Sequence, residues 1–279
     1  MSQDRGTAGN RGRTWAIILA GGEGTRLAGT IESWLGDARP KQYCTFVGSR
    51  SMLQHTVDRA AQVVSRRRIV AVIAGHHRQF FRSALRSRFP GIVLEQPADR
   101  GTAAGLFAAL SQILARDARA KIIVMPSDHF IAPERRFCRQ ASLALRLAGR
   151  CPAKLVLMGA RPDRAETDYG WIVPGRAKGG ADGGRRLADV EQFVEKPDNG
   201  VAQRLCESGG LWSTLVLAAD ARRLWMLGRS LAPEVMPCFD LLRRQLLRTA
   251  AGHSEPIPLS RRMAALYECM PSCDLSRDI

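Results

Sequence analysis

The residues near the start of the chain that are best suited to chemistry form a glycine-rich loop. Residues 15–20 are apolar and few enough for one buried strand, and residues 21–26 read Gly-Gly-Glu-Gly-Thr-Arg. Glycines let backbone amides approach phosphate oxygens without a Cβ in the way, and Arg26 adds a forked, permanently charged donor. Neither G-x-G-x-x-G nor G-x-x-x-x-G-K-[ST] is present. The loop predicts a third kind of phosphate site; a tight turn that merely needs glycine is the alternative.

Two further charged residues lie where a phosphate or a metal ion could be held. Lys41 follows Pro40, which disfavours a helical conformation at Arg39, so we expect Lys41 on an extended segment. Asp128 follows the apolar run 121–125. A carboxylate at the carboxyl end of a central strand can hold Mg²⁺ against a phosphate. A solvated lysine and a capping aspartate are the alternatives.

The elements that must position these residues alternate between strand and helix. The predicted strands are residues 69–73, 92–96, 121–125 and 155–158. The predicted helices are residues 77–88, 102–116, 134–147, 199–207, 240–247 and 263–270. Ser51 and Thr102 are suitable N-caps, Ser51 for a further helix on which Leu53 and Val57 share a face. This alternation predicts a parallel sheet covered by helices on both faces.

Beyond about residue 158 the pattern changes to shorter β-type pieces. Tyr169 and Gly170 suit a sugar ring passing close to backbone, although an edge strand with a bulge would have the same pattern. Residues 175–185 predict a flexible hairpin tip. Glu195 and Lys196 would point to opposite faces of a regular strand, so the strand must twist or bulge there if both contact one ligand.

Composition limits the classes of protein to which the chain can belong. With 279 residues, 45% of them hydrophobic, one large α/β domain or two small ones can form a core. No apolar run of about 18 residues occurs, and residues 1–14 are polar, so we expect a disordered tail there, no membrane span and a cytoplasmic protein. The seven cysteines form no C-x-x-C pair and are interpreted as reduced structural thiols.

The net charge of +16 does not by itself indicate nucleic-acid binding. Five of the 42 basic residues are lysine, which leaves 37 arginines, scattered over nearly every predicted helix. No basic patch interleaved with aromatic residues accompanies them. The positive field is expected to favour an anionic nucleotide instead.

The motifs together resemble those of the sugar-phosphate nucleotidylyltransferases, over nearly everything from Trp15 to Ile279. Residues 19–27 meet every fixed position of L-A-G-G-x-G-T-R-L. The resemblance implies that Arg26 stabilises the departing pyrophosphate and that Lys41, in P-K-Q, contacts substrate phosphates. Asp128 lies in P-S-D-H, which resembles the metal-binding motif of mannose-1-phosphate guanylyltransferases and implies Mg²⁺ as cofactor. The implied nucleotide-binding residues are Leu19, Gly21, Gly22, Gly24, Thr25, Gln96, Gly101 and Thr102.

The same resemblance implies a sugar-phosphate site later in the chain. In F-x-E-K-P, Lys196 would bind the phosphate and Glu195 the sugar hydroxyls, with Tyr169 and Gly170 nearby. Ser213 stands where the family has asparagine in L-W-N, and its reach is shorter, so we expect one sugar contact to be missing or bridged by water. The chain stops before the family's W-x-D-x-G element, which supplies a second metal carboxylate. Either Asp274 substitutes, or the metal site is incomplete, or the gene product is shortened.

The sequence thus predicts a Rossmann-like, doubly wound α/β fold. Its mixed, mostly parallel sheet carries helices on both faces and a small β-rich sugar-binding insertion, within one domain at 15–279 that is shortened at its C-terminus. The expected reaction transfers a guanylyl group from GTP to α-D-mannose 1-phosphate. The alternatives are a UTP, dTTP or CTP enzyme and a catalytically impaired nucleotide-sugar-binding homologue. Expected partners are GTP and a sugar 1-phosphate, without nucleic acid or membrane, and a homodimer is left open.

Overall fold

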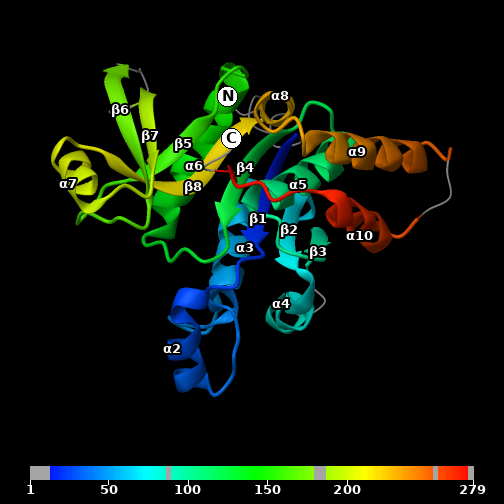
Figure 1. Ribbon diagram of the computed structural model, residues 1–279, viewed down its shortest axis with the longest axis horizontal. Helices are drawn as coiled ribbons and strands as arrows, with labels where there is room; N and C mark the ends of the chain where they lie inside the picture. Colours follow the sequence, from blue (N-terminus) through cyan, green and yellow to red (C-terminus); the bar gives the residue numbers. More distant parts are fainter. Residues whose placement is uncertain (1–12, 86–88, 179–186, 254–256, 276–279) are drawn as a thin grey trace, which may run out of the picture. The chain divides into compact units, whose positions relative to one another are not determined.

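The chain divides into two compact units, Met1–Val156 with Leu217–Ile279, and Leu157–Val216. The computed structural model describes residues 13–85, 89–178, 187–253 and 257–275. The second unit interrupts the first in sequence, as expected for an insertion (Figure 1). Of the predicted tail at 1–14, residues 1–12 lie outside the described residues, and Thr14 already belongs to the first strand.

A parallel sheet forms the centre of the first unit. Its strands run in the order β3-β2-β1-β4, and each neighbouring pair is parallel. Every residue of β2 is buried, which explains why this strand is an unbroken apolar run instead of an alternating one. Leu217–Asp220, the end of β8, adds an antiparallel strand beside β4, so the sheet is mixed and mostly parallel as predicted. The strands are β1 (Thr14–Ala20), β2 (Ile69–Ala74), β3 (Ile92–Gln96), β4 (Lys121–Pro126) and β8 (Leu211–Asp220).

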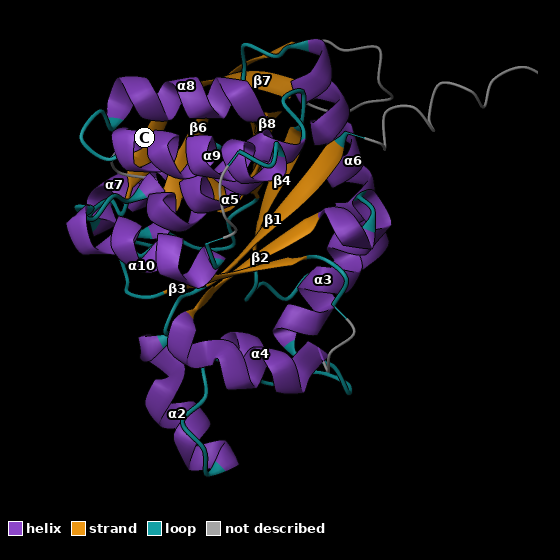
Figure 2. Ribbon diagram, turned by 90° about the vertical axis from the view of Figure 1, so that its right-hand side faces the viewer, coloured by secondary structure: helices purple, strands orange, loops and turns teal. Residues whose placement is uncertain are grey.

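Helices cover both faces of this sheet, as predicted. In Figure 2, α5, α8 and α9 gather on one face, and α3 and α6 lie on the other. Ser51 caps α3 through a capping box with Gln54, which confirms its predicted role. The helices of this unit are α2 (Thr25–Leu35), α3 (Met52–Val63), α4 (Arg78–Leu85), α5 (Thr102–Arg116), α6 (Glu134–Arg150), α8 (Ala221–Leu231), α9 (Met236–Ala250) and α10 (Leu259–Cys269).

Two local predictions in this unit are wrong. Lys41 begins a 3₁₀ turn, η1 (Lys41–Tyr43), instead of lying on an extended segment, because proline restricts the residue before it and not the residue after it. Thr102 is the first residue of α5, and Gly101 is the N-cap. The Thr102 hydroxyl instead donates to the carboxylate of Asp274, 3.3 Å away, so it does not cap its own helix.

The second unit is a small β-rich body with one helix. Strand β6 pairs antiparallel with β7 and, through Trp171 and Ile172, with the start of β8. Trp171 is buried and packs against Trp212 with ring centroids 6.3 Å apart. Of the predicted flexible hairpin tip at 175–185, residues 175–178 belong to strand β6 instead, and residues 179–185 lie outside the described residues. The remaining elements are β5 (Val156–Ala160), β6 (Gly170–Lys178), β7 (Leu187–Glu195) and α7 (Asn199–Glu207).

Two predictions from composition can be compared with the structure. All seven cysteines are free, in agreement with reduced thiols, but Cys151 and Cys269 are exposed and so do not belong to the core. Among the helices that the structure describes, none has the length and apolar character that a membrane crossing would need.

Candidate active site

The order of the strands places the glycine loop beside Asp128. From β1 the chain goes to β2 and β3 on one side, and then to β4 on the other side of β1. The loops that follow β1 and β4 therefore diverge at the carboxyl ends of two adjacent strands, the position at which doubly wound sheets bind ligands. The Ser127 amide donates to the Leu19 carbonyl over 3.0 Å, which joins the two loops at their bases.

Lys41 and Asp128 meet at this position. The Lys41 Nζ lies 2.6 Å from the Asp128 Oδ2, and both side chains are partly exposed. Gly24 has a φ of +65°, and a Cβ there would lie 3.1 Å from the Lys41 Cγ. Glycine at this position thus satisfies both a left-handed backbone and a close side-chain approach. The glycine loop, the ammonium and the carboxylate, predicted separately, lie together in the first unit.

Arg26 occupies the first turn of α2, directly after the glycine loop. Gly24 is the N-cap of α2, and no side chain caps this end of the helix. Thr25 and Arg26 are exposed. Amide groups at a helix N-terminus together with a guanidinium suit a polyphosphate chain.

Gln42 is a contributor to the site that sequence reasoning missed. Its side chain is buried, and its Nε2 donates to the carbonyls of Ala20, at 3.2 Å, and Gly22, at 2.8 Å. These bonds fix the path of the glycine loop from outside the loop. The P-K-Q motif contains this residue, so a signal was present in the sequence, but only its lysine was considered.

The segment after β4 is anchored by a buried arginine that was also missed. Arg59 donates from Nη2 to the Thr56 hydroxyl, at 2.6 Å, and to the His129 carbonyl, at 2.9 Å, and its Nη1 lies 3.4 Å from Glu134. Burial lowers the pKa of Arg59 and also the pKa of His129. Arg59 thereby fixes the residue next to Asp128.

The segment that carries the predicted nucleotide-binding residues Gln96, Gly101 and Thr102 contacts the C-terminal part of the chain. Gln96 donates from Nε2 to the Tyr267 hydroxyl at 3.0 Å. The Cys273 amide donates to the Arg100 carbonyl at 2.9 Å, and its own carbonyl accepts from the Ala103 amide at 3.1 Å. Gly101 lies between these two hydrogen bonds and has a φ of +83°. A Cβ there would lie 2.3 Å from the Cys273 oxygen. Residues 267–274 therefore shape the loop that carries Gln96, Gly101 and Thr102.

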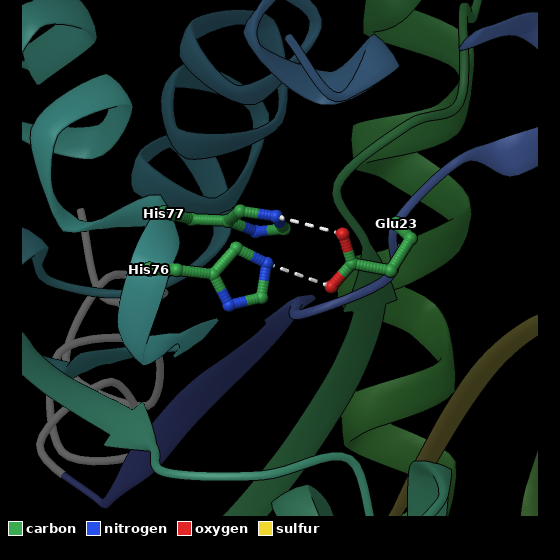
Figure 3. Close-up of side chains that lie close together, drawn as sticks. All are labelled: Glu23, His76 and His77. Carbon is green, nitrogen blue, oxygen red and sulfur yellow. Dashed lines mark hydrogen bonds and ion pairs between the residues drawn. The ribbon is translucent and has the colours of Figure 1, made fainter. Parts of the chain in front are cut away.

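Glu23, in the glycine loop, lies between two histidines (Figure 3). His76 Nε2 is 2.9 Å from one carboxylate oxygen, and His77 Nε2 is 3.3 Å from the other. Burial lowers the pKa of His77, against the opposing effect of Glu23. No motif in the sequence signalled this cluster.

In the second unit, four of the predicted sugar-phosphate residues lie together. Gly170 pairs with Glu195 in the β6–β7 ladder, and a Cβ on Gly170 would lie 2.7 Å from the Glu195 Oε2. The Lys196 amide donates to the Tyr169 carbonyl at 3.2 Å. Lys196 has a φ of +46°, a left-handed conformation directly after the end of β7. The backbone thus departs from regular strand geometry at Lys196, while the shared ligand of Glu195 and Lys196 stays a prediction.

Ser213 lies in β8, next to Trp212, which contacts Tyr169 with ring centroids 5.3 Å apart. Its hydroxyl accepts a hydrogen bond from the Leu215 amide at 3.4 Å. Leu215 has a positive φ of 55°, so the strand is irregular here. The contact of Ser213 with a sugar stays a prediction, as does the sharing of one crevice by these residues and the glycine loop.

The fold and the site in the first unit are typical of nucleotide-binding α/β proteins. Comparison with known families identifies the family within this class. Residues 15–232 match the family described as nucleotidyl transferase. This chain belongs to that family of enzymes.

Relatives of this chain include polysaccharide biosynthesis proteins. The xanthan biosynthesis protein XanB of Xanthomonas campestris pv. campestris (strain B100) is 35% identical over 196 residues, 69% of this chain and 39% of the relative. The mannose-1-phosphate guanylyltransferase of Salmonella montevideo is 34% identical over 196 residues, 69% and 40% of the two chains. The alginate biosynthesis protein AlgA of Pseudomonas aeruginosa is 29% identical over 261 residues, 91% and 50%. The chain thus spans half or less of the length of these relatives.

Solved structures share the fold. The mannose-1-phosphate geranyltransferase of Thermus thermophilus superposes with a TM-score of 0.72 and 23% identity, over 96% of this chain and 70% of that chain. The mannose-6-phosphate isomerase of Helicobacter pylori gives a TM-score of 0.65 with 19% identity, over 83% and 80% of the two chains. At such identities the likeness concerns the fold alone.

Proposed function

We propose that this chain transfers a nucleotidyl group from a nucleoside triphosphate to a sugar 1-phosphate, with GTP and α-D-mannose 1-phosphate as the pair. The observation that carries the proposal is the meeting of Lys41 and Asp128, 2.6 Å apart, next to the glycine loop at the switch point of the sheet. The relative from Salmonella montevideo, named mannose-1-phosphate guanylyltransferase, supports the choice of substrates.

In the proposed reaction an oxygen of the sugar phosphate attacks the α-phosphorus of the triphosphate. The bond from the α-phosphorus to the bridging oxygen breaks, and pyrophosphate leaves with the electron pair of that bond. No protein nucleophile is needed, because catalysis of such transfers is mainly positioning and neutralisation of charge. The loop amides and Arg26 would hold the triphosphate and the departing pyrophosphate, and Lys41 would neutralise phosphoryl oxygens.

The residues present fit Mg²⁺ through Asp128. Magnesium in phosphoryl-transfer sites is commonly held by one or two carboxylates together with the substrate phosphates, so a single carboxylate at the glycine loop suffices on the protein side. When bound, the ion would supply charge neutralisation to the phosphates. Asp274, the candidate second carboxylate, accepts a hydrogen bond from Thr102 at 3.3 Å, and its role towards a metal is part of the proposal.

The second unit would supply the acceptor. Lys196 would hold the phosphate of the sugar 1-phosphate, Glu195 would accept hydrogen bonds from sugar hydroxyls, and the ring of Tyr169 would lie against the sugar. Their clustering at the end of β7 supports one shared ligand. Ser213 has a shorter reach than the family's asparagine, so its contact with the sugar would be missing or bridged by water.

Pyrophosphate release tests the proposal. Purified chain with Mg²⁺, GTP and α-D-mannose 1-phosphate is expected to release pyrophosphate and to form GDP-mannose, and neither product should appear when the sugar phosphate is omitted. Parallel reactions with ATP, UTP, CTP and dTTP measure base selectivity. Faster release with another nucleotide would overturn the choice of GTP but keep the class of reaction. The contrary result is saturable nucleotide binding without release of pyrophosphate from any pair of nucleotide and sugar phosphate. That result would contradict the enzyme proposal and support a nucleotide-sugar-binding domain instead.

A further inference from the structure

The geometry points to a binding site for one transition-metal ion of the Zn²⁺ type, formed by Glu23, His76 and His77. The ligand atoms of the three residues lie within 4.8 Å of one another. Both imidazoles present Nε2 to the same carboxylate, at 2.9 and 3.3 Å (Figure 3). The two rings lie edge to face with centroids 4.3 Å apart. The three side chains therefore converge on one small volume.

The separations require a modest adjustment to hold an ion. Zinc binds imidazole nitrogen and carboxylate oxygen at about 2.0–2.2 Å in tetrahedral geometry, so two ligand atoms on one ion lie about 3.4 Å apart. Because the ligand atoms of this cluster lie within 4.8 Å of one another, the widest gap must close by at most about 1.4 Å. Glu23 and His76 can make this movement, because their side chains are 47% and 65% exposed, whereas His77 is 1% exposed and fixed. One rigid ligand and two adjustable ones form the site.

The donor set selects the class of ion. Two imidazoles and a carboxylate suit Zn²⁺, Co²⁺, Ni²⁺ or Fe²⁺, whereas Mg²⁺ and Ca²⁺ take oxygen ligands. Three protein ligands leave at least one coordination position for water or another ligand. The ion differs in chemistry from the Mg²⁺ proposed at Asp128.

The site joins the glycine loop to the turn that follows β2. Glu23 belongs to the glycine loop, and both histidines belong to η3 (Gly75–His77), the turn after β2. An ion held by all three would link the loop to the sheet. The inference does not rest on the proposed function, because binding of the ion involves neither nucleotide nor sugar.

A carboxylate shared by two imidazoles could instead be held by hydrogen bonds alone. The chain offers an internal comparison, since His55 Nδ1 lies 3.3 Å from the Glu134 carboxylate without a second histidine. Among the residues that the structure describes, the group around Glu23 is the one set of three potential metal ligands. Metal affinity that depends on Glu23 and His76, but not on His55, would distinguish coordination from simple pairing.

The test is a metal titration of the full chain after treatment with EDTA, in the absence of nucleotide. Isothermal titration with Zn²⁺ is expected to show one site per chain. Titration with Co²⁺ should give a visible absorption band that saturates at one ion per chain. The variants His76→Ala and Glu23→Gln, whose side chains are both well exposed, should weaken Zn²⁺ binding at least tenfold. The controls His55→Gln and His253→Ala should bind as the unaltered chain does, with circular dichroism reporting the fold of every variant.

Three outcomes would overturn the inference. One is the lack of saturable binding of Zn²⁺ or Co²⁺ by the unaltered chain. Another is equal affinity in His76→Ala, Glu23→Gln and the unaltered chain. The third is an equal loss in the His253→Ala control, which would assign the binding to scattered surface histidines.

Discussion

Lys41 and Asp128 provide charges of both signs at the edge of the glycine loop. Lys41 is one of five lysines in a chain with 37 arginines, and its ammonium is a compact point charge, unlike the planar guanidinium fork. Their ion pair is partly exposed, at 35% for Lys41 and 26% for Asp128. Such pairs contribute about 0–1 kcal/mol to stability. The pair therefore adds little to folding, in agreement with the role in ligand binding proposed for both residues.

We expect Arg26→Ala and Asp128→Ala each to lower the rate of pyrophosphate release by about 10²-fold or more, because each removes a charge aimed at the transition state. Their free energies of unfolding in urea should stay within about 1 kcal/mol of the unaltered chain. The matched control is Asp58→Ala, which removes a similarly exposed carboxylate of α3 that pairs with Arg50 and Arg66. Near-normal turnover in either test variant, or an equal loss in the control, would refute the assigned roles.

At the scale of elements, the two loops proposed to bind the nucleotide are held by different means. The glycine loop is fixed by Gln42, which donates to carbonyls of the loop, and by its own left-handed Gly24. The loop before α5 is fixed by backbone pairing with Cys273 on both sides of Gly101. Glycine is thus required for packing at position 101, whereas Gly22 has nothing within 4 Å of an added Cβ.

This difference predicts that a change from glycine to alanine affects stability at one position and nucleotide affinity at the other. Gly101→Ala should lower the free energy of unfolding by about 1–3 kcal/mol or more, because its backbone conformation is nearly exclusive to glycine and its Cβ would meet the Cys273 carbonyl. Gly22→Ala should change stability by less than about 1 kcal/mol but reduce nucleotide affinity, because a methyl group would stand where phosphate approaches. Urea unfolding and nucleotide titration measure the two effects. Full nucleotide affinity in Gly22→Ala would contradict the phosphate role of the loop.

At the scale of the whole molecule, the two proposed substrates are assigned to two units of the chain. The triphosphate residues belong to Met1–Val156, and the sugar-phosphate residues belong to Leu157–Val216. The strand β8 contributes residues to both units. The proposed reaction needs residues from both units. The role of each unit can therefore be tested by measuring the binding of the substrate assigned to it.

Lys196→Ala is expected to raise the KM for the sugar 1-phosphate by about ten- to a hundredfold, the loss of one hydrogen bond to a charged group. The dissociation constant for GTP should stay within about twofold, because the triphosphate contacts lie in the other unit. Lys154→Ala is the control for loss of a lysine. A parallel loss of GTP affinity, or an unchanged KM, would show that the units do not divide the substrates in this way.

Local patterns in the sequence were sufficient for the elements and for several site residues. The apolar run of β1 ending in glycines, the N-cap at Ser51 and the irregular backbone at Lys196 are set by neighbours within a few residues, and each was predicted. Where the local rule was applied one residue too far, as at Lys41 after Pro40, the prediction failed. Short-range sterics and hydrogen bonding decide these features, so the sequence alone carries them.

Contacts between distant segments were decided only by the tertiary structure. The sequence does not show that Gln42 reaches Ala20, that Tyr267 holds Gln96, or that Glu23 lies between two histidines. These contacts follow from the parallel pairing of β1 with β2 and β4, and from the path of the C-terminal segment past α5. Packing of whole elements fixes such neighbours, because side chains far apart in sequence meet only when the sheet has brought the ends of its strands together.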